Sequence, residues 1–399
     1  MDALVTEWIG MMLRWLHVIA GIAWIGSSFY FIHLDLSLRK RTGLAEGVGG
    51  EAWQVHGGGF YRMQKYLVAP AEMPEDLTWF KWEAYATWIS GFLLLAAVYY
   101  TSADLYLIDR GVLDLTPATA VIVSLVLLVS GWITYDLMCR SPLGKNDTLL
   151  MLLGFVLLVA IAWGCTQIFS GRGAYIQIGA LVGTIMAANV LMIIIPNQRK
   201  VVASLLAHEE PDPRLGKQAK QRSLHNNYLT LPVLFLMISN HYPITFATEW
   251  SWVIVGVVIV MGVSIRHFFN SQHAGKGSPW WTWALAAAGG LTILWLNSFP
   301  VAAPAMGRAA GLERNEVFAA VEEVISSRCS MCHAAEPVWE GVATPPLNVR
   351  LETPEDILRE ASRIEIQAVL SRAMPPGNVT EMTEEERHMI AAWLAARKG

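Results

Sequence analysis

The sequence predicts an all-α protein, in which a polytopic membrane bundle of eight transmembrane helices is followed by a small, separate helical domain. Three observations favour this class. The 399 residues are 54% hydrophobic and only 16% charged, whereas soluble domains carry about 25% charged residues. Eight mostly apolar stretches approach the roughly 20 residues that a helix needs to cross a bilayer. The last part is acidic, because residues 308–399 hold ten Lys and Arg against fifteen Asp and Glu.

The predicted spans are apolar runs separated by polar or charged connections. They cover residues 8–32, 82–100, 118–139, 148–169, 174–195, 224–240, 248–268 and 280–299. The third and fourth are the clearest, and the sixth is the weakest because it is short and polar at one end. The long connection 33–81 mixes aromatic, basic and apolar residues. We expect it to pack under the bundle as an interfacial or re-entrant element.

Basic residues between the spans predict the orientation. The connections 33–81, 140–147, 196–223 and 266–279 carry sixteen Lys and Arg, and the alternate connections carry two. Basic residues are retained on the cytoplasmic side. The N-terminus and the C-terminal segment are therefore expected outside. No basic run suggests binding to nucleic acid.

The Ala-, Pro- and Gly-rich stretch "FPVAAPAMGRAAG" marks a domain boundary. We therefore divide the chain into a transmembrane domain at 1–300, a linker at 301–311 and a C-terminal domain at 312–399. The acidic C-terminal domain would attract a basic soluble partner, in a salt-dependent way.

The C-terminal domain contains the motif Cys329-x-x-Cys332-His333. A structural zinc site needs four ligands, and the other two cysteines, Cys139 and Cys165, fall in or beside the bundle. A redox dithiol would need a βαβ context, which is absent. Two thiols at this spacing can reach the two vinyl groups of one haem, and the adjacent histidine can reach its iron.

Flanking helices complete the pattern of this domain. A helix precedes the motif, and a second helix opens at Thr383 with Glu386 at the capping-box position. The domain resembles a small class I-type cytochrome c over its whole length. We therefore predict one covalent haem c on Cys329 and Cys332, with His333 as an iron ligand. Met374 in "AMPPG" is the predicted second iron ligand, while Met382 and Met389 are nearby alternatives.

Polar residues of the first span share one helix face. Arg14, His17, Gly21, Trp24 and Ser28 are spaced by three and four residues. Ionisable groups inside a bilayer are functional candidates. His17 is interpreted either as a ligand of a buried haem b or as a histidine hydrogen-bonded within the bundle. If haem b is present, His17 and His241 are the expected axial pair.

A second polar group gathers at the predicted inner ends of the spans. Its members include His33, Asp35, His225, Asn226, Asn227 and Arg266. Amides and imidazoles suit a flat substrate with several hydrogen-bonding edges. The same residues also serve as ordinary interhelical hydrogen-bonders, and Arg266 could simply extend its charge to the interface.

The whole chain resembles the bacterial membrane-bound urate oxidase (urate hydroxylase) family. The resemblance rests on "LRWLHVIAGIAWIGSSFYFIHLDLSL", "GGGFYRMQKYLVAP", "SLHNNYLTLPVLFLMISNHYP" and the Cys-x-x-Cys-His motif. It implies an enzyme of the bacterial inner membrane, where the orientation predicted from the basic residues places the N-terminus and the cytochrome domain in the periplasm. It also implies oxidation of urate to 5-hydroxyisourate, with electrons passing through haem c to a soluble cytochrome c and then to a terminal oxidase.

This chemistry needs a general base and a cation for the urate anion. We expect the base among His33, Asp35 and His225, the cation at Arg266 or Arg62, and further substrate contacts at Asn226 and Asn227. Two other interpretations stay open. The chain could be a non-catalytic subunit that passes electrons from quinol to cytochrome c. It could also be a transporter or haem-handling protein with a cytochrome sensor.

Overall fold

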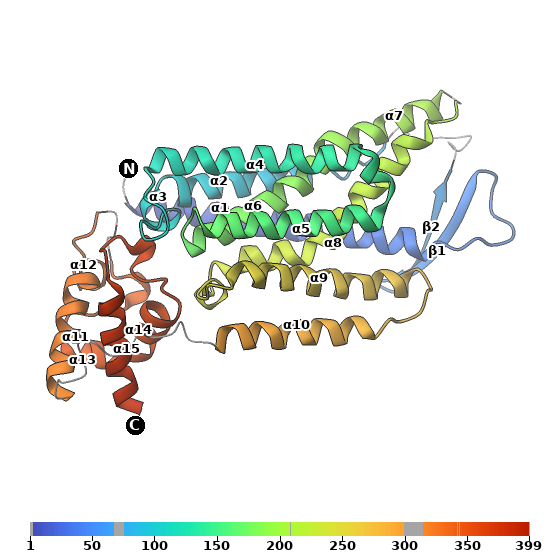
Figure 1. The fold of residues 1–399 in the computed structure, drawn as a ribbon. Helices are drawn as coiled ribbons and strands as arrows, with labels where there is room; N and C mark the ends of the chain where they lie inside the picture. The colour runs from blue at the N-terminus through green and yellow to red at the C-terminus, as the bar shows by residue number, and fades with distance from the viewer. Residues whose placement is uncertain are drawn as a thin grey trace.

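The computed structural model describes residues 3–67, 76–207, 209–298, 314–340, 342 and 344–398. It is mostly helical, with a long bundle of roughly parallel helices and a smaller helical domain at one end (Figure 1). A β-hairpin projects from the opposite end of the bundle (Figure 1). We call these the cytochrome end and the hairpin end. The expected linker at 301–311 lies outside the described residues.

Each predicted span contains a helix. The bundle helices are α1 (Ala3–Ser37), α2 (Trp82–Leu95), α4 (Pro117–Arg140), α5 (Asp147–Thr166), α6 (Gly171–Ala188), α8 (Pro213–Ser239), α9 (Ser251–His273) and α10 (Trp281–Ser298). The π-helical turns η1 (Ala96–Tyr100) and η3 (Asn189–Ile194) prolong α2 and α6, and α3 (Ala103–Tyr106) precedes α4. The helix α7 (Ile195–Leu206) and the first turns of α8 extend past the hairpin end of the bundle (Figure 1).

The bundle belongs in a membrane. Within the described residues, five helical stretches are long and apolar enough to cross a bilayer: Val5–Ser37, Pro117–Arg140, Asp147–Thr166, Gly171–Leu206 and Ser251–His273. The other three bundle helices pack beside these, α2 on α1 and α6, α8 on α6 and α9, and α10 on α9. The count of eight spans therefore stays a prediction.

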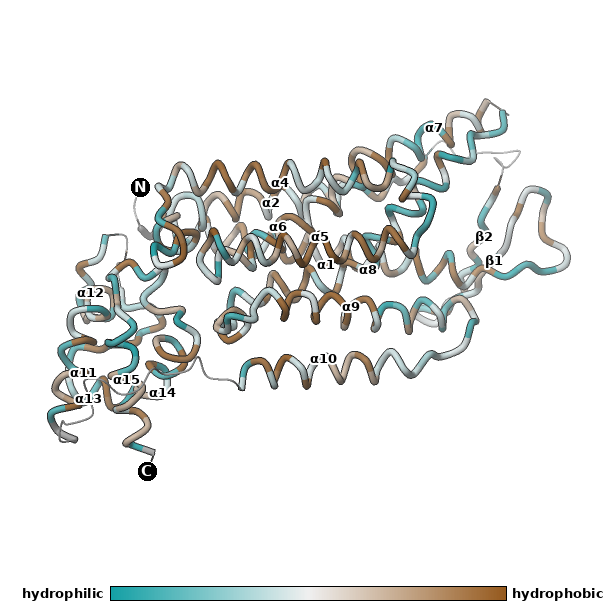
Figure 2. Tube along the Cα trace, in the orientation of Figure 1, coloured by the Kyte–Doolittle hydropathy of each residue, from teal (hydrophilic) through white to brown (hydrophobic). Residues whose placement is uncertain are grey.

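An exposed apolar stripe on α4 shows what surrounds the bundle. Ile122, Val126, Val129, Ile133 and Leu137 recur every three or four residues, and each is exposed. Figure 2 shows the matching hydrophobic segments along α4 and α5. Exposing so much apolar surface to water is energetically unfavourable. A stripe of this kind is therefore typical of a helix face in contact with lipid.

The mostly helical fold is interrupted by strands between α1 and α2, which the sequence analysis did not predict. There β1 (Val48–His56) and β2 (Gly59–Tyr66) form an antiparallel hairpin rather than a re-entrant segment. Gly57 and Gly58 at the turn have φ of +59° and +79°. Two consecutive left-handed residues favour a tight hairpin turn, so the flanking residues pair with each other. Glu51 of β1 is 5% exposed and accepts hydrogen bonds from Arg62 and Trp53.

The C-terminal domain has its own helices and core. Its elements are α11 (Arg314–Arg328), α12 (Ser330–His333), α13 (Pro354–Arg359), α14 (Ala361–Ile364) and α15 (Glu384–Lys398), with the short turns η5 (Pro346–Asn348), η6 (Glu365–Leu370) and η7 (Pro376–Asn378). The α11 and α15 helices pack together, with the rings of Phe318 and Trp393 stacked 5.5 Å apart. Their side chains close a buried core around Ile325 and Ile390.

The predicted cap of α15 is confirmed. The Thr383 hydroxyl accepts from the Glu386 backbone N–H at 3.2 Å, and the Glu386 carboxylate accepts from the Thr383 N–H at 2.7 Å. Such a cap stabilises a helix by about 1 kcal/mol. Glu386 also accepts from Arg328 at 2.9 Å, so the cap joins α15 to the helix before the Cys-x-x-Cys-His motif.

Candidate haem and substrate sites

A cavity of about 980 Å³ lies between the cytochrome domain and the cytochrome end of the bundle. Cys329, Cys332, His333 and Met374 all line it. Pockets for organic ligands range from roughly 300 to 1,000 Å³, so this volume suits a large cofactor. The sequence motif and the predicted second iron ligand therefore lie at one cavity, which we call the haem cavity.

The backbone around His333 orients its ring for metal binding. The Nδ1 atom lies 2.9 Å from the Val349 carbonyl oxygen, which can only accept, so Nδ1–H is the donor. That bond leaves Nε2 with the lone pair that binds a haem iron. Desolvation raises the pKa of the Cys329 thiol to about 12 and also raises the pKa of the Cys332 thiol. These residues fit a haem of the c type.

Met374 is held in place by a buried arginine that the sequence did not single out. Arg387 of α15 is 5% exposed and donates to the carbonyl oxygens of Met374, at 2.9 Å, and of Ala368. A third bond reaches the Asn378 side chain at 3.3 Å. Burial lowers the pKa of Arg387. The Met374 loop is thus fixed to α15 by hydrogen bonds from one guanidinium group.

The Met374 loop also docks the cytochrome domain on its own bundle. Gly377 has a φ of +56° and packs so closely that an added Cβ would lie 2.5 Å from the carbonyl oxygens of Asp104 and Ile108. Ala373 packs against the bundle core. Only glycine fits this position, because it supplies both the left-handed backbone and the missing side chain.

A different site lies at the hairpin end, where α1, α8 and α9 meet. The Arg266 guanidinium lies 3.8 Å from the centre of the Phe29 ring. It donates to Asn227 at 3.4 Å and to Asn270 at 3.2 Å, and Asn270 donates to Asn227 at 2.9 Å. Arg266 is 6% exposed, and no carboxylate among the described residues pairs with it. A buried cation without a counterion favours binding of an anion.

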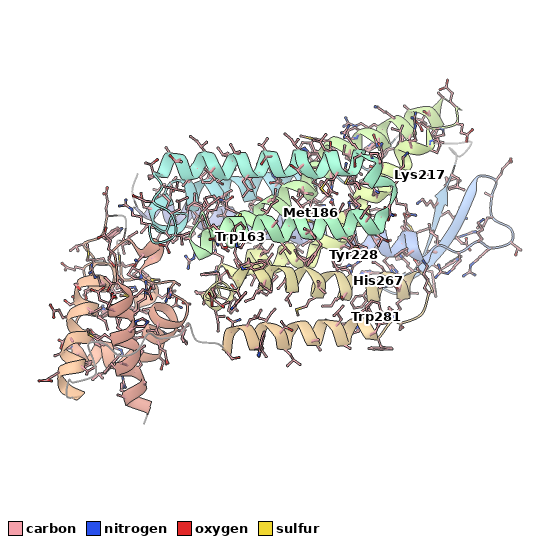
Figure 3. All side chains as sticks on the ribbon, in the orientation of Figure 1. Trp163, Met186, Lys217, Tyr228, His267 and Trp281 are labelled. Atoms are coloured by element: carbon pink, nitrogen blue, oxygen red, sulfur yellow. The ribbon has the colours of Figure 1, made fainter. Side chains whose placement is uncertain are left out.

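Two histidines extend this group along the same helices. The rings of His33 on α1 and His273 on α9 lie 4.4 Å apart, and His273 is close enough to Arg266 to interact with it electrostatically. We call Phe29, His33, Asn227, Arg266, Asn270 and His273 the Arg266 cluster. Nearby, the Tyr228 hydroxyl lies 3.3 Å from His267 Nδ1, and Figure 3 shows both toward the hairpin end.

Unused hydrogen-bonding atoms concentrate in the Arg266 cluster. Among the described residues, five buried side-chain atoms lack a partner, and three of them belong to His33, Asn227 and His273. A buried polar group without a partner costs roughly 1–3 kcal/mol. Their gathering beside an unpaired cation is typical of a binding site rather than of packing.

The predicted residues His225 and Asn226 belong to a separate and satisfied network. His225 Nδ1 lies 2.7 Å from the Tyr135 hydroxyl, and Asn226 accepts from Asn189 at 2.9 Å and donates to the Met186 carbonyl. Arg222 in this network pairs with Asp136 at 2.7 Å. We interpret these bonds as joining α4, η3 and α8, because each of these groups has its partner.

Asp35 and Arg62 form ion pairs with residues outside the Arg266 cluster. Asp35 is half-exposed and pairs with Lys65 at 2.7 Å, and Arg62 pairs with Glu51 at 2.6 Å within the hairpin. Residues two apart on a helix point in different directions, so Asp35 does not share the face of His33.

His17 and His241 occupy different surroundings. His17 packs on Gly91 of α2, and its Nδ1 lies 3.0 Å from the Thr87 carbonyl oxygen and 3.2 Å from the Ser90 hydroxyl. The carbonyl makes Nδ1 the donor and leaves Nε2 available. His241 is exposed after α8 and lines the haem cavity, whose lining does not include His17.

Sequence reasoning missed Phe29, Asn270, His273 and Arg387. The first three follow from helical spacing, since Phe29 lies four residues before His33, and Asn270 and His273 lie four and seven residues after Arg266. That periodicity places them on the same faces. No pattern in the sequence marks Arg387.

The fold and these sites define a class of membrane protein that carries a haem in a separate C-terminal domain. A family model described as urate oxidase N-terminal matches residues 3–297. A second, described as cytochrome C oxidase, cbb3-type, subunit III, matches residues 316–394. The chain therefore belongs to the urate oxidase family with a C-terminal cytochrome c domain. Searches of curated proteins and of solved structures found no match.

Proposed function

We propose that the chain oxidises urate to 5-hydroxyisourate at the Arg266 cluster and passes the electrons to haem c and then to a soluble cytochrome c. The observation that carries the location is the buried Arg266, which has no carboxylate partner among the described residues. Urate is a planar anion with several hydrogen-bonding edges. It would offset the charge of Arg266 and give a partner to the free amide of Asn227.

The reaction consumes one urate and one water and releases one 5-hydroxyisourate, two protons and two electrons. The paired rings of His33 and His273 each have an unpartnered Nδ1. They are placed to take protons as water adds to the oxidised ring. The guanidinium of Arg266 packs against the ring of Phe29. This ring would offer a flat apolar surface beside the bound purine. His33 thus keeps its expected role, and His225 and Asp35 give way to His273.

The cytochrome domain would hold haem c by thioethers from Cys329 and Cys332, with His333 and Met374 on the iron. Its chemistry is one-electron acceptance, so each urate needs two transfers. Fifteen residues of α9 separate Ser251, which lines the haem cavity, from Arg266. At 1.5 Å per residue this separation is about 22 Å. Because electron transfer weakens steeply with distance, we propose a relay within the bundle. Of the two histidines expected to hold a haem b, only His241 lines the haem cavity, so we assign the relay to no particular group.

The proposed topology has eight spans in a bacterial inner membrane. The cytochrome end, with the N-terminus, would face the periplasm, where haem c is attached and a soluble cytochrome c delivers electrons to a terminal oxidase. The Arg266 cluster would then face the cytoplasm. The sixteen-to-two division of Lys and Arg between the two sets of connections supports this orientation.

Anaerobic spectroscopy tests the proposal on the full chain in detergent. Urate added to the oxidised protein is expected to produce the sharpened absorption bands of reduced haem c. A quinol that reduces the haem where urate does not would instead support the electron-transfer subunit. A pyridine haemochrome spectrum would show whether haem b accompanies haem c.

A further inference from the structure

The haem cavity is completed by residues of the membrane bundle. Arg172 at the start of α6, Tyr106 of α3 and Arg14 of α1 line it together with the cytochrome motif. The cavity is therefore shared between two parts of the chain that the sequence separates by a linker. A haem bound there would face the bundle as well as its own domain.

Arginines on the two sides of the cavity differ in their partners. Those of the cytochrome domain are paired, Arg328 with Glu386 at 2.9 Å, Arg363 with Glu360 at 3.0 Å and Arg372 with Glu384 at 2.6 Å. Those of the bundle, Arg14 and Arg172, have no carboxylate partner within the described ranges. The free positive charge at the cavity thus comes from the membrane domain.

Arg172 is better placed than Arg14 to hold a fixed positive charge at the haem cavity. Its guanidinium lies 5.4 Å from the centre of the Tyr106 ring, a distance at which a cation and an aromatic ring attract. Arg172 is half-buried, whereas Arg14 is exposed. Tyr106 is in turn fixed by the hydrogen bond from the Ser170 hydroxyl to its carbonyl oxygen at 2.8 Å. The bundle therefore holds this cation at the cavity before any cofactor binds.

We propose that Arg172, supported by Arg14, binds the carboxylate side chains of haem c across the domain junction and thereby raises its reduction potential in the docked state. This inference rests on the proposed haem c. A haem carries two propionate carboxylates, and charge-assisted bonds to arginine are the strong way to satisfy them. A cation beside the haem disfavours the ferric state, which has one more positive charge than the ferrous state. Docking would thus make the haem a better acceptor while it faces the bundle.

Two carboxylates at the same cavity would oppose the rise in the reduction potential of the haem. Asp109 and Glu249 also line the cavity. Asp109 accepts from the Gly111 backbone at 2.9 Å and interacts electrostatically with Arg387. Neither carboxylate pairs with Arg172 in the part of the chain that the structure describes.

The test is the midpoint potential of haem c in the full-length protein, measured by spectroelectrochemistry in detergent. Arg172→Gln is expected to lower the equilibrium constant for accepting one electron about tenfold. This corresponds to a fall of about 59 mV in the midpoint potential. The potential should also become pH-dependent near neutrality, because an unpaired propionate binds a proton more readily. Arg172→Lys keeps the charge and should retain most of the potential.

Arg110 provides the matched control, since it lies at the same end but is 62% exposed and near Asp104 and Asp114. Arg110→Gln should leave the potential unchanged. An unchanged potential in Arg172→Gln, or an equal fall in Arg110→Gln, would overturn the proposal. If Arg172→Gln does not accumulate with haem, Arg14→Gln is expected to give a smaller fall, and an unchanged potential there would also overturn it. These outcomes do not depend on urate, so failure of the proposed substrate is separately visible.

Discussion

The difference between two buried arginines yields a sharp prediction. Arg266 has no carboxylate partner among the described residues, whereas Arg222 pairs with Asp136 at 2.7 Å. Both are nearly inaccessible, at 6% and 3% exposed. If Arg266 binds substrate and Arg222 joins helices, then replacing each by glutamine must affect different quantities.

Arg266→Gln should mainly weaken urate oxidation. A hydrogen bond to a charged group contributes about 1.5–3 kcal/mol, so kcat/KM should fall about 10- to 150-fold, with the loss largely in KM if the charge holds the substrate. Stability should not fall by a comparable amount, because the substitution removes a buried cation that lacks a counterion.

Arg222→Gln should mainly weaken folding. It leaves Asp136 without its buried partner, and breaking a buried pair costs roughly 3–5 kcal/mol. The lower end applies here, because Arg140 still pairs with Asp136 at 2.6 Å. Urate kinetics per folded molecule should stay close to those of the unaltered chain.

The assay combines anaerobic stopped-flow reduction of haem c by urate with thermal unfolding of the same preparations. The expected pattern is a kinetic defect without instability in Arg266→Gln, and instability without a kinetic defect in Arg222→Gln. The reverse pattern, or normal urate kinetics in Arg266→Gln, would refute the assignment of the substrate site.

Three further predictions concern the other end of the chain and the hairpin. Arg387→Leu should free the Met374 loop and lower the fraction of haem with methionine on its iron, seen as loss of the near-infrared methionine-to-iron band. Gly377→Ala should undock the cytochrome domain and slow haem reduction by urate, whereas Gly58→Ala, with similar backbone strain but open space around it, should not. Hydrogen bonds from Trp53 and Arg62 hold the pKa of Glu51 below its ordinary value of 4.5. The hairpin should therefore have its full stability above pH 4.5 and lose stability as the pH falls below that value. Hydrogen exchange of the hairpin amides, corrected for intrinsic rates, measures this loss.

The chain's local patterns were enough for the membrane bundle, the haem motif and the cap of α15. Each apolar run that was predicted to span the membrane contains a helix, because the bilayer imposes a length that a short window of sequence reveals. The bounds agree less well where polar residues extend a helix, since α8 begins at Pro213 and the predicted span at 224. The Cys-x-x-Cys-His motif and Thr383 with Glu386 are likewise contained in single turns. The hairpin was also readable from Gly57 and Gly58, but the mixture of aromatic and basic residues around them resembled an interfacial segment.

Only the tertiary structure decided which polar residues act together. His225, Asn226 and Asn227 are consecutive, yet a turn of about 100° per residue sends Asn227 to Arg266 and its neighbours to Tyr135 and Asn189. Whether a polar group is satisfied depends on partners far along the chain, which composition and spacing do not contain. For the same reason the sequence analysis did not single out Arg172. This residue lines the haem cavity only because two domains meet there.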